Sequence, residues 1–360
     1  MLRNKNFQIG LLAFIVIAVQ LMITFTGKTP YLTQLTMTGY YSMVIIGLTL
    51  LMGYTGQISL GHAGFFAIGG YTSALLTTFN MLPYRSKPLI SLLENVGVLT
   101  LRKDLYEMDI LTVTPWAACI AAVILSVLIA WIIGRPVLKL KGHYLAMATL
   151  GFGTIIYKIV LATTFLGAAD GLSDIPGFSL FPGLEVSGKS SIRIENYYIA
   201  WGLVIVSMIL LTNLIHSRVG RALRSIHAAE DASNAMGVNT AQYKLKIFIL
   251  SAALASLGGV FLTHFNGGIG PSEASIMKSV RYVAIVAIGG MANLWGALFM
   301  GVLLNFLSLR GYLGSFDDAV FGAILIIIML FAPDGLLNKD LFTGIWFKLK
   351  RLAWKKVNTE

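Results

Sequence analysis

The eight residues from Gly183 to Ser190, GLEVSGKS, fit the phosphate-binding pattern G-x-x-x-x-G-K-[ST]. In nucleotide-binding proteins this pattern lies between a buried strand and a helix, and backbone N–H groups at the helix N-terminus hold the phosphates. Here Pro182 precedes the motif, and nothing around it has the pattern of a parallel sheet. We therefore expect this chain not to hydrolyse ATP itself.

A second candidate for chemistry is the segment QISLGHAG, residues 57 to 64, in which Ser59 and His62 could form a nucleophile and base. Acyl transfer would also need an orienting group and an oxyanion hole, and the sequence identifies neither. Small and polar residues in transmembrane chains more often serve helix packing and hydrogen bonds between helices. We expect no catalytic residue here, and an intramembrane hydrolase stays as an alternative.

Metal chemistry has little support in the sequence. The one cysteine, Cys119, lies inside an apolar run, which excludes an internal disulfide and a cysteine-based metal site. No metal is expected at the other histidines, His143, His216, His227 and His264.

Lys158 is an ionisable residue within the apolar run 144–166. A charge at membrane depth is energetically costly, so Lys158 is a candidate functional residue. The alternative is that its side chain reaches toward the membrane surface or a neighbouring helix.

The elements that must hold these residues are apolar helices. The chain has 360 residues, of which 56% are hydrophobic and only 12% charged, about half the usual share for a soluble protein. Runs near the length of about 20 residues that crosses a bilayer recur along it. We predict an all-α, polytopic membrane protein with about ten segments: 7–27, 36–53, 63–79, 113–133, 144–166, 197–216, 245–265, 281–290, 294–309 and 315–332.

Two joints between these segments are rich in glycine: GYTGQISLGHAG at 53–64 and GGMANLWG at 289–296. Irregular backbone at membrane depth is tolerated only where it is buried in protein or faces water, and broken helices in two halves indicate a transport path. We therefore predict glycine-broken helices and an inverted repeat of two five-helix halves. The predicted path residues are Gln57, Ser59, Gly61, His62, Gly64 and Lys158.

The basic residues indicate an orientation. Of the 27 Lys and Arg residues, 16 fall in the N-terminus, 134–143, 217–246 and the tail after Pro333. By the positive-inside bias these parts are cytoplasmic, with both termini inside, and the net charge of +11 does not indicate nucleic-acid binding. We divide the chain into a transmembrane domain, 1–340, and a basic amphipathic tail, 341–360, that lies along anionic membrane lipids.

The stretch GRALRSIHAAEDASNAMG, residues 220 to 237, is the most polar helix expected between two apolar runs. Val219, Leu223, Ile226, Ala229, Ser233 and Met236 recur at steps of three and four, which predicts one amphipathic helix over about 218–237. Gly237 can end the helix in the left-handed conformation, and Asn239 or Thr240 can cap the next. The stripe is weakly hydrophobic, which favours a groove on a protein over lipid.

Four segments together resemble one family: GYTGQISLGHAGFFAIGGYTSALL (53–76), LKLKGHYLAMATLGFGTII (138–156), DGLSDIPG (170–177) and GRALRSIHAAEDASNAMGVNTAQYKL (220–245). In order and spacing they are similar to the M-type permease of bacterial branched-chain amino acid ABC importers. The resemblance implies a transport subunit of the inner membrane, not an enzyme. It implies four kinds of partner: a second permease, two cytoplasmic ATPase subunits that use the ATP, an extracytoplasmic solute-binding protein, and lipid.

By this resemblance Glu230, Ala232 and Gly237 match the motif that docks on the ATPase. The helix pattern adds four more candidates for that contact: Arg221, Arg224, Ile226 and Ala229. No cofactor is expected in this chain. The alternatives are a permease for urea or short amides, and a secondary transporter or channel that works alone.

Overall fold

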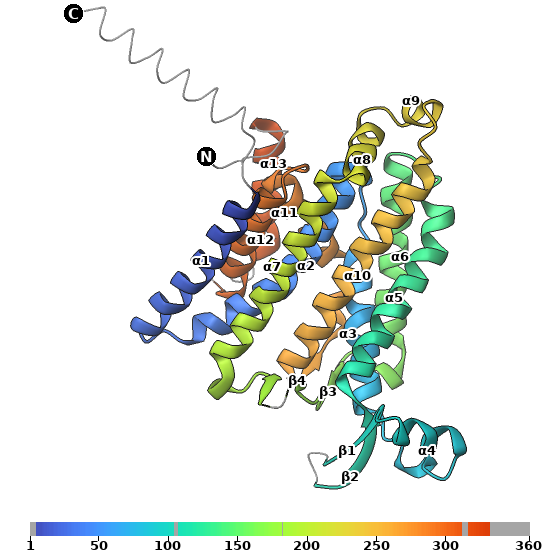
Figure 1. Ribbon diagram of the computed structural model, residues 1–360, viewed down its shortest axis with the longest axis vertical. Helices are drawn as coiled ribbons and strands as arrows, with labels where there is room; N and C mark the ends of the chain where they lie inside the picture. Colours follow the sequence, from blue (N-terminus) through green and yellow to red (C-terminus); the bar gives the residue numbers. More distant parts are fainter. Residues whose placement is uncertain (1–4, 104–106, 182, 312–315, 332–360) are drawn as a thin grey trace, which may run out of the picture.

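The computed structural model describes residues 5–103, 107–181, 183–311 and 316–331, which form a bundle of long helices (Figure 1). Six helical stretches are long and apolar enough to cross a membrane. They are α1 (Lys5–Phe25), α2 (Pro30–Thr55), α5 (Pro115–Val137), α6 (His143–Ala162), α7 (Arg193–His216) with the turn before it, and α10 (Thr240–Asn266). The chain is thus a multi-pass helical membrane protein, as the composition predicts.

Four further apolar helices are shorter than the expected length of a span: α3 (His62–Thr78), α11 (Ile276–Gly289), α12 (Leu294–Leu309) and α13 (Asp317–Phe331). Each of the ten predicted apolar runs overlaps one α-helix, and six of these helices are long enough to cross a membrane on their own. The predicted glycine joints lie next to three of the shorter ones. Residues 56–61 and 290–293 are not helical, and they separate α2 from α3 and α11 from α12 at the predicted glycine joints. The inverted repeat stays a prediction.

The bundle has two distinct ends (Figure 1). At one end, which we call the α8–α9 end, the short helices α8 (Arg218–Ala228) and α9 (Glu230–Ala235) connect α7 to α10. At the other, the strand end, lie α4 (Pro88–Asn95) and the antiparallel hairpin of β1 (Leu99–Lys103) and β2 (Asp109–Val113). The amphipathic patch LISLLENVGVL, residues 89–99, predicts a short surface helix in this segment, and α4 confirms the helix.

Two further pairs of short strands belong to the strand end. The strands β3 (Leu172–Ser173) and β6 (Gly268–Ile269) pair with each other, as do β4 (Phe178–Phe181) and β5 (Leu184–Val186), and both pairs are antiparallel. The segment GLEVSGKS contains β5, and the side chain of Lys189 forms an ion pair with Glu185 at 3.4 Å. This arrangement does not have the parallel sheet of a nucleotide-binding fold.

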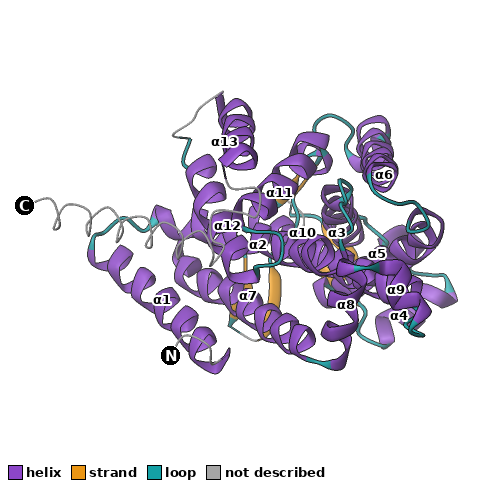
Figure 2. Cartoon of the chain, turned by 90° about the horizontal axis from the view of Figure 1, so that it is seen from above, coloured by secondary structure: helices purple, strands orange, loops and turns teal. Residues whose placement is uncertain are grey.

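Helix α2 lies at the centre of the bundle (Figure 2). It is buried along almost its whole length and packs against α7, α10, α11 and α12. By contrast, α1, α5 and α6 expose large apolar side chains such as Phe14, Ile132 and Met147. Continuous apolar surface of this kind is suited to lipid or to another membrane subunit. The tail 341–360 lies outside the described residues.

Candidate functional site

The polar stretch after α7 forms two short helices, and not the single helix predicted over 218–237. The backbone leaves the helical conformation at Ala229, where φ is −157° and ψ is 97°, and α9 starts again at Glu230. The Ser217 hydroxyl caps α8 by accepting a hydrogen bond from the Val219 N–H at 3.1 Å. Alanine has the highest helix propensity, so the break cannot follow from local preference and must come from contacts made elsewhere.

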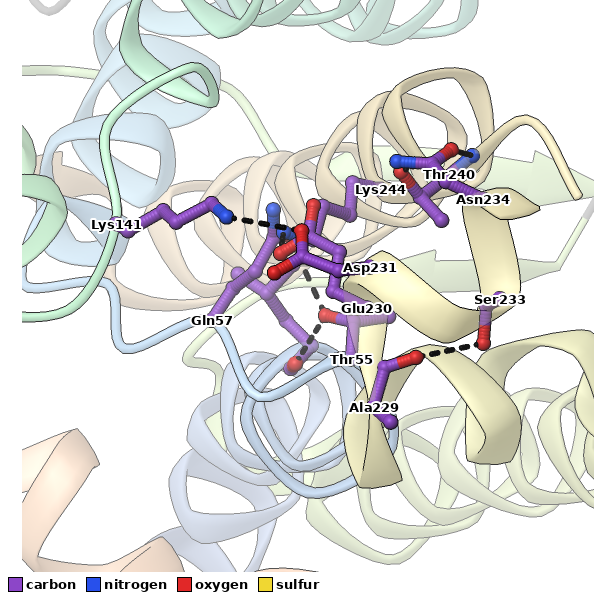
Figure 3. A network of polar contacts seen from close by, with 11 residues as sticks. Thr55, Gln57, Lys141, Ala229, Glu230, Asp231, Ser233, Asn234, Thr240 and Lys244 are labelled. Carbon is purple, nitrogen blue, oxygen red and sulfur yellow. Dashed lines mark hydrogen bonds and ion pairs between the residues drawn. The ribbon is translucent and has the colours of Figure 1, made fainter.

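One such contact is an ion pair between Glu230 and Lys244. Lys244 lies in the second turn of α10, and its Nζ atom is 2.5 Å from Oε2 of Glu230 (Figure 3). The lysine side chain is only 9% exposed and the glutamate 26%. Loss of Glu230 would leave the buried Lys244 ammonium without its counter-charge, which is destabilising. The pair fixes the start of α9 to the start of the spanning helix α10.

The turn between α9 and α10 is held by local hydrogen bonds. Gly237 has φ +84°, as predicted for a residue that ends a helix in the left-handed conformation. The Asn239 side chain caps α10 by accepting from the Gln242 N–H at 3.1 Å, which confirms one of the two predicted caps. The other candidate, Thr240, instead donates its hydroxyl to Oδ1 of Asn234 at 3.1 Å (Figure 3).

The apolar stripe of this region faces the chain's own bundle. Leu223 is fully buried, Ile226 is 3% exposed and Ser233 is 6% exposed. The expectation that this stripe enters a groove on a partner is therefore wrong for these residues. Helix α8 packs against α2, α7 and α10, and α9, which carries Ser233, packs against α8 and α10. The residues left on the outer face are Arg221, Arg224, His227, Ala229, Asp231, Ala232 and Met236.

Two contacts join this region to other connections at the same end. Lys141, which follows α5, forms an exposed ion pair with Asp231 at 3.2 Å. The ring of His227 lies against Gly56, where an added β-carbon would be 3.1 Å from Nδ1. Gly56 begins the first glycine joint, so α8 touches the connection between α2 and α3 directly.

The first glycine joint carries a buried hydrogen-bond network. His62 lies between two hydroxyl groups, with Nδ1 3.0 Å from Oγ of Ser59 and Nε2 2.9 Å from Oγ of Ser251 in α10. Gln57, Ser59 and His62 are all at most 2% exposed. The second ring nitrogen of His62 therefore contacts another hydroxyl, whereas a hydrolase would have a carboxylate at that position. The geometry favours a structural network over nucleophilic catalysis.

Glycine lets this joint approach α6 closely. A β-carbon at Gly61 would lie 2.7 Å from the Thr149 carbonyl oxygen and 3.0 Å from the ring of Phe152. Gly64 is less tight, since its β-carbon would be 3.4 Å from the same ring. The Leu60 N–H also donates to the Thr149 hydroxyl at 3.0 Å. The joint is thus packed into the bundle at membrane depth, where irregular backbone needs such partners.

The two glycine joints touch each other. A β-carbon at Gly53 would overlap the backbone of Met291, and the Tyr54 hydroxyl donates to the Ala292 carbonyl at 3.0 Å. These residues are more than 230 positions apart in the sequence, and only the fold brings them together. The connections α2–α3 and α11–α12 therefore form one contact region near the α8–α9 end.

Lys158 is not part of this region. It is exposed and lies one turn before the end of α6 at Ala162, whereas Gln57, Ser59 and His62 are buried. From this position a lysine can reach the membrane surface. Its predicted place with the other path residues is not found. Across the parts of the chain that the structure describes, no group of three His, Cys, Asp or Glu residues could hold a metal ion.

The sequence did not indicate three charged residues of functional interest. Lys244 is 14 positions from Glu230 with a turn between them, and no periodicity links the two. Glu273 and Lys278 form a second ion pair at the strand end, at 2.8 Å. Their third partner, the Tyr41 hydroxyl, comes from α2. The only sign of these residues in the sequence is that each is a charged residue next to an apolar run.

A bundle of apolar helices with two broken segments, and with short polar helices held across one end, defines a polytopic membrane protein of the permease class. Comparison with known families gives the particular one. The family "Branched-chain amino acid transport system / permease component" matches residues 31–331, and this chain belongs to that family.

Individual relatives agree with this assignment. The permease protein LivM of a high-affinity branched-chain amino acid transport system from Escherichia coli K12 is 29% identical, over 96% of this chain and 77% of the relative. LivM of Salmonella typhimurium is also 29% identical, over 84% and 68%. The permease LivH of Escherichia coli K12 is 27% identical, over 83% and 91%. The comparison with solved structures gives no match for this chain.

Proposed function

We propose that this chain is one permease subunit of an ATP-driven importer for branched-chain amino acids. The LivM and LivH relatives are both named as permease proteins of a high-affinity branched-chain amino acid transport system, which supports a second, related permease as the partner of this chain. Two ATPase subunits supply the energy and an extracytoplasmic binding protein supplies the substrate. The chain itself holds no cofactor and carries out no reaction.

The observation that carries this proposal is the attachment of α8 and α9. They are short helices at one end of the bundle, and the buried Glu230–Lys244 pair ties them to α10. A motion of an ATPase bound to their outer face would pass into α10 through this pair, and through His227 into the first glycine joint. In this proposal Arg221, Arg224, Ala229 and Ala232 form the docking face, while Ile226, Glu230 and Gly237 hold it in place.

The docking test introduces a tryptophan at Ala229. This residue is exposed, so the bulky ring should be tolerated by the chain and should block the partner. The matched control is Ser190→Trp, because Ser190 is also exposed but lies with the strand end. We expect Ala229→Trp to lose copurification of the ATPase and uptake of radiolabelled leucine, and Ser190→Trp to keep both. If Ala229→Trp binds the ATPase and transports like the parent, the docking face is wrongly assigned.

The orientation is tested by cysteine labelling. With Cys119, which is buried, replaced by serine, single cysteines are placed at Ser190 and at Ser225. The two positions are exposed and belong to opposite ends of the bundle. We expect an impermeant maleimide to label position 190 in whole cells and position 225 only after lysis. Labelling of both positions in intact cells would contradict a cytoplasmic α8–α9 end.

A further inference from the structure

A small polar hollow lies between α2, α11 and α12. It is lined by Tyr41 from α2, by Lys278, Arg281 and Tyr282 from α11, and by Asn305, Ser308 and Leu309 from α12. Its volume is about 30 Å³. A single water needs about 10–15 Å³ of such space, so the hollow has room for one small polar or charged group, with the rest of a ligand outside its mouth.

The lining is rich in groups that donate hydrogen bonds. The Arg281 guanidinium donates to the Ser308 hydroxyl at 2.9 Å. The Lys278 ammonium lies 2.8 Å from the Tyr41 hydroxyl and 4.3 Å from the centre of that ring. Two cationic side chains in the wall of one hollow favour an anion, and arginine binds planar carboxylates particularly well.

The Glu273 carboxylate fixes one of these cations. It accepts from Lys278 at 2.8 and 2.9 Å and from the Tyr41 hydroxyl at 3.0 Å. Glu273 belongs to the short 3₁₀-helix η4 (Pro271–Ala274), directly before α11. The lysine and the tyrosine are therefore held in fixed positions at the edge of the hollow.

Tyr282 gives an independent sign of a ligand. Its side chain is 1% exposed and borders the hollow, and among the described residues its hydroxyl has no hydrogen-bond partner. A buried hydroxyl without a partner is unfavourable, and folded proteins seldom leave one without a reason. A ligand oxygen in the hollow would satisfy it.

We propose that this hollow binds the α-carboxylate of the amino acid that passes through the permease. Arg281 and Lys278 supply the positive charge and Tyr282 supplies a further donor, while the aliphatic side chain of the substrate points to the mouth. The site rests on the proposed function, since it takes the transported amino acid as its ligand. The three side chains are binding residues, and Glu273 is a positioning residue for Lys278.

The decisive variant is Tyr282→Phe, which removes only the hydroxyl without a partner. The chain loses no hydrogen bond, so folding should be unchanged. The matched control is Tyr40→Phe, because the Tyr40 hydroxyl is also buried without a partner but does not line the hollow. Arg281→Lys is a second variant that keeps the charge and removes the planar fork.

The measurement is saturation-transfer NMR of leucine binding to the full chain with its copurifying subunits in phosphatidylcholine nanodiscs. We expect leucine to bind and leucinamide, which lacks the carboxylate, to bind about tenfold more weakly, the usual effect of one hydrogen bond to a charged group. Tyr282→Phe and Arg281→Lys should each weaken leucine binding several-fold, and acetate should compete with leucine. Tyr40→Phe should behave like the parent.

Three outcomes would overturn the proposal. One is equal binding of leucine and leucinamide. Another is parental leucine binding in both Tyr282→Phe and Arg281→Lys. A requirement for anionic lipid in the nanodiscs would also overturn it, because the hollow would then hold a lipid headgroup. Leucine uptake by the complete transporter tests the proposed function separately: uptake with no effect of these variants leaves the permease role intact and removes only the site.

Discussion

Lys244 and Lys278 are both partly or fully buried at the start of a helix and both pair with a glutamate from the short helix before it, but they lie at opposite ends of the bundle. In the pair of Lys244 with Glu230 the lysine side chain is only 9% exposed, and the pair joins α9 to α10. The Lys278 pair is shared with Tyr41 and borders a hollow. The same two residue types thus serve attachment at one end and, in our proposal, recognition at the other.

The difference comes from the third partner. An ion pair between adjacent elements of the chain can hold those elements and little else. When a hydroxyl from α2 joins Glu273 and Lys278, three elements must keep a fixed separation around the charges, and the space between them is not filled by side chains. The stability of substituted chains measures how far each end depends on its lysine.

The largest effect is expected for Lys244→Met. This change leaves the Glu230 carboxylate beside an apolar chain, and breaking a buried pair in this way costs about 3 kcal/mol. The midpoint of thermal unfolding in detergent should fall accordingly. The double variant Glu230→Gln/Lys244→Met should recover most of the loss, since no charge is left without its partner. If the single and double variants were equally unstable, lost packing and not charge would be the cause.

A smaller loss is expected for Lys278→Met, about 2 kcal/mol, because the Tyr41 hydroxyl continues to donate to Glu273 after the lysine is removed. The same thermal measurement applies. Adding Tyr41→Phe to this variant should destabilise the chain further by about 1 kcal/mol. A loss as large as that of Lys244→Met would show that the two ends depend equally on their lysines.

For Gly237→Val we expect a loss of about 1–2 kcal/mol from the left-handed conformation of the backbone. No atom lies within 4 Å of the position of a new β-carbon, so steric overlap contributes nothing. Gly237→Asn is the control, since asparagine tolerates this conformation better and should lose less. Because the turn joins α9 to α10, the valine variant should also retain the ATPase in a pull-down but release phosphate without leucine uptake.

The smallest effect is expected for Asp231→Ala. The side chains of Asp231 and its ion-pair partner Lys141 are 89% and 67% exposed, and ion pairs between exposed side chains contribute little to stability. The unfolding midpoint should not change measurably, and neither should its dependence on salt. A clear loss of stability would mean that the whole outer face of α9, and not only Glu230, holds this end together.

Local features of the α8–α9 end were predictable from the sequence. Gly237 and Asn239 act within a few residues of themselves, so their roles as helix end and cap could be inferred directly. The direction of the apolar stripe could not. Periodicity shows that Leu223 and Ile226 share a face, but only the position of α2 shows that this face is turned inward.

Contacts between distant parts of the chain could not be predicted from the sequence either, because they depend on how the helices are arranged. The break at Ala229 opposes local helix propensity, and the residue after it, Glu230, pairs with Lys244 in another helix. The link from Tyr41 to Glu273 spans 232 positions. For Lys158 the apolar run left two positions open, membrane depth or reach toward the surface. The helix ends one turn later and the lysine is exposed, which no neighbouring residue in the sequence indicates.

The contact between the two glycine joints has a consequence for motion. Backbone from 53 and from 291 occupies the space that a side chain would need, so neither segment can slide past the other by one residue without a collision. Packed interiors change between discrete arrangements and do not deform smoothly. A rotation of α2 against α3 would therefore carry the α11–α12 connection with it. In the importer that we propose, the two joints would then move together and not one at a time.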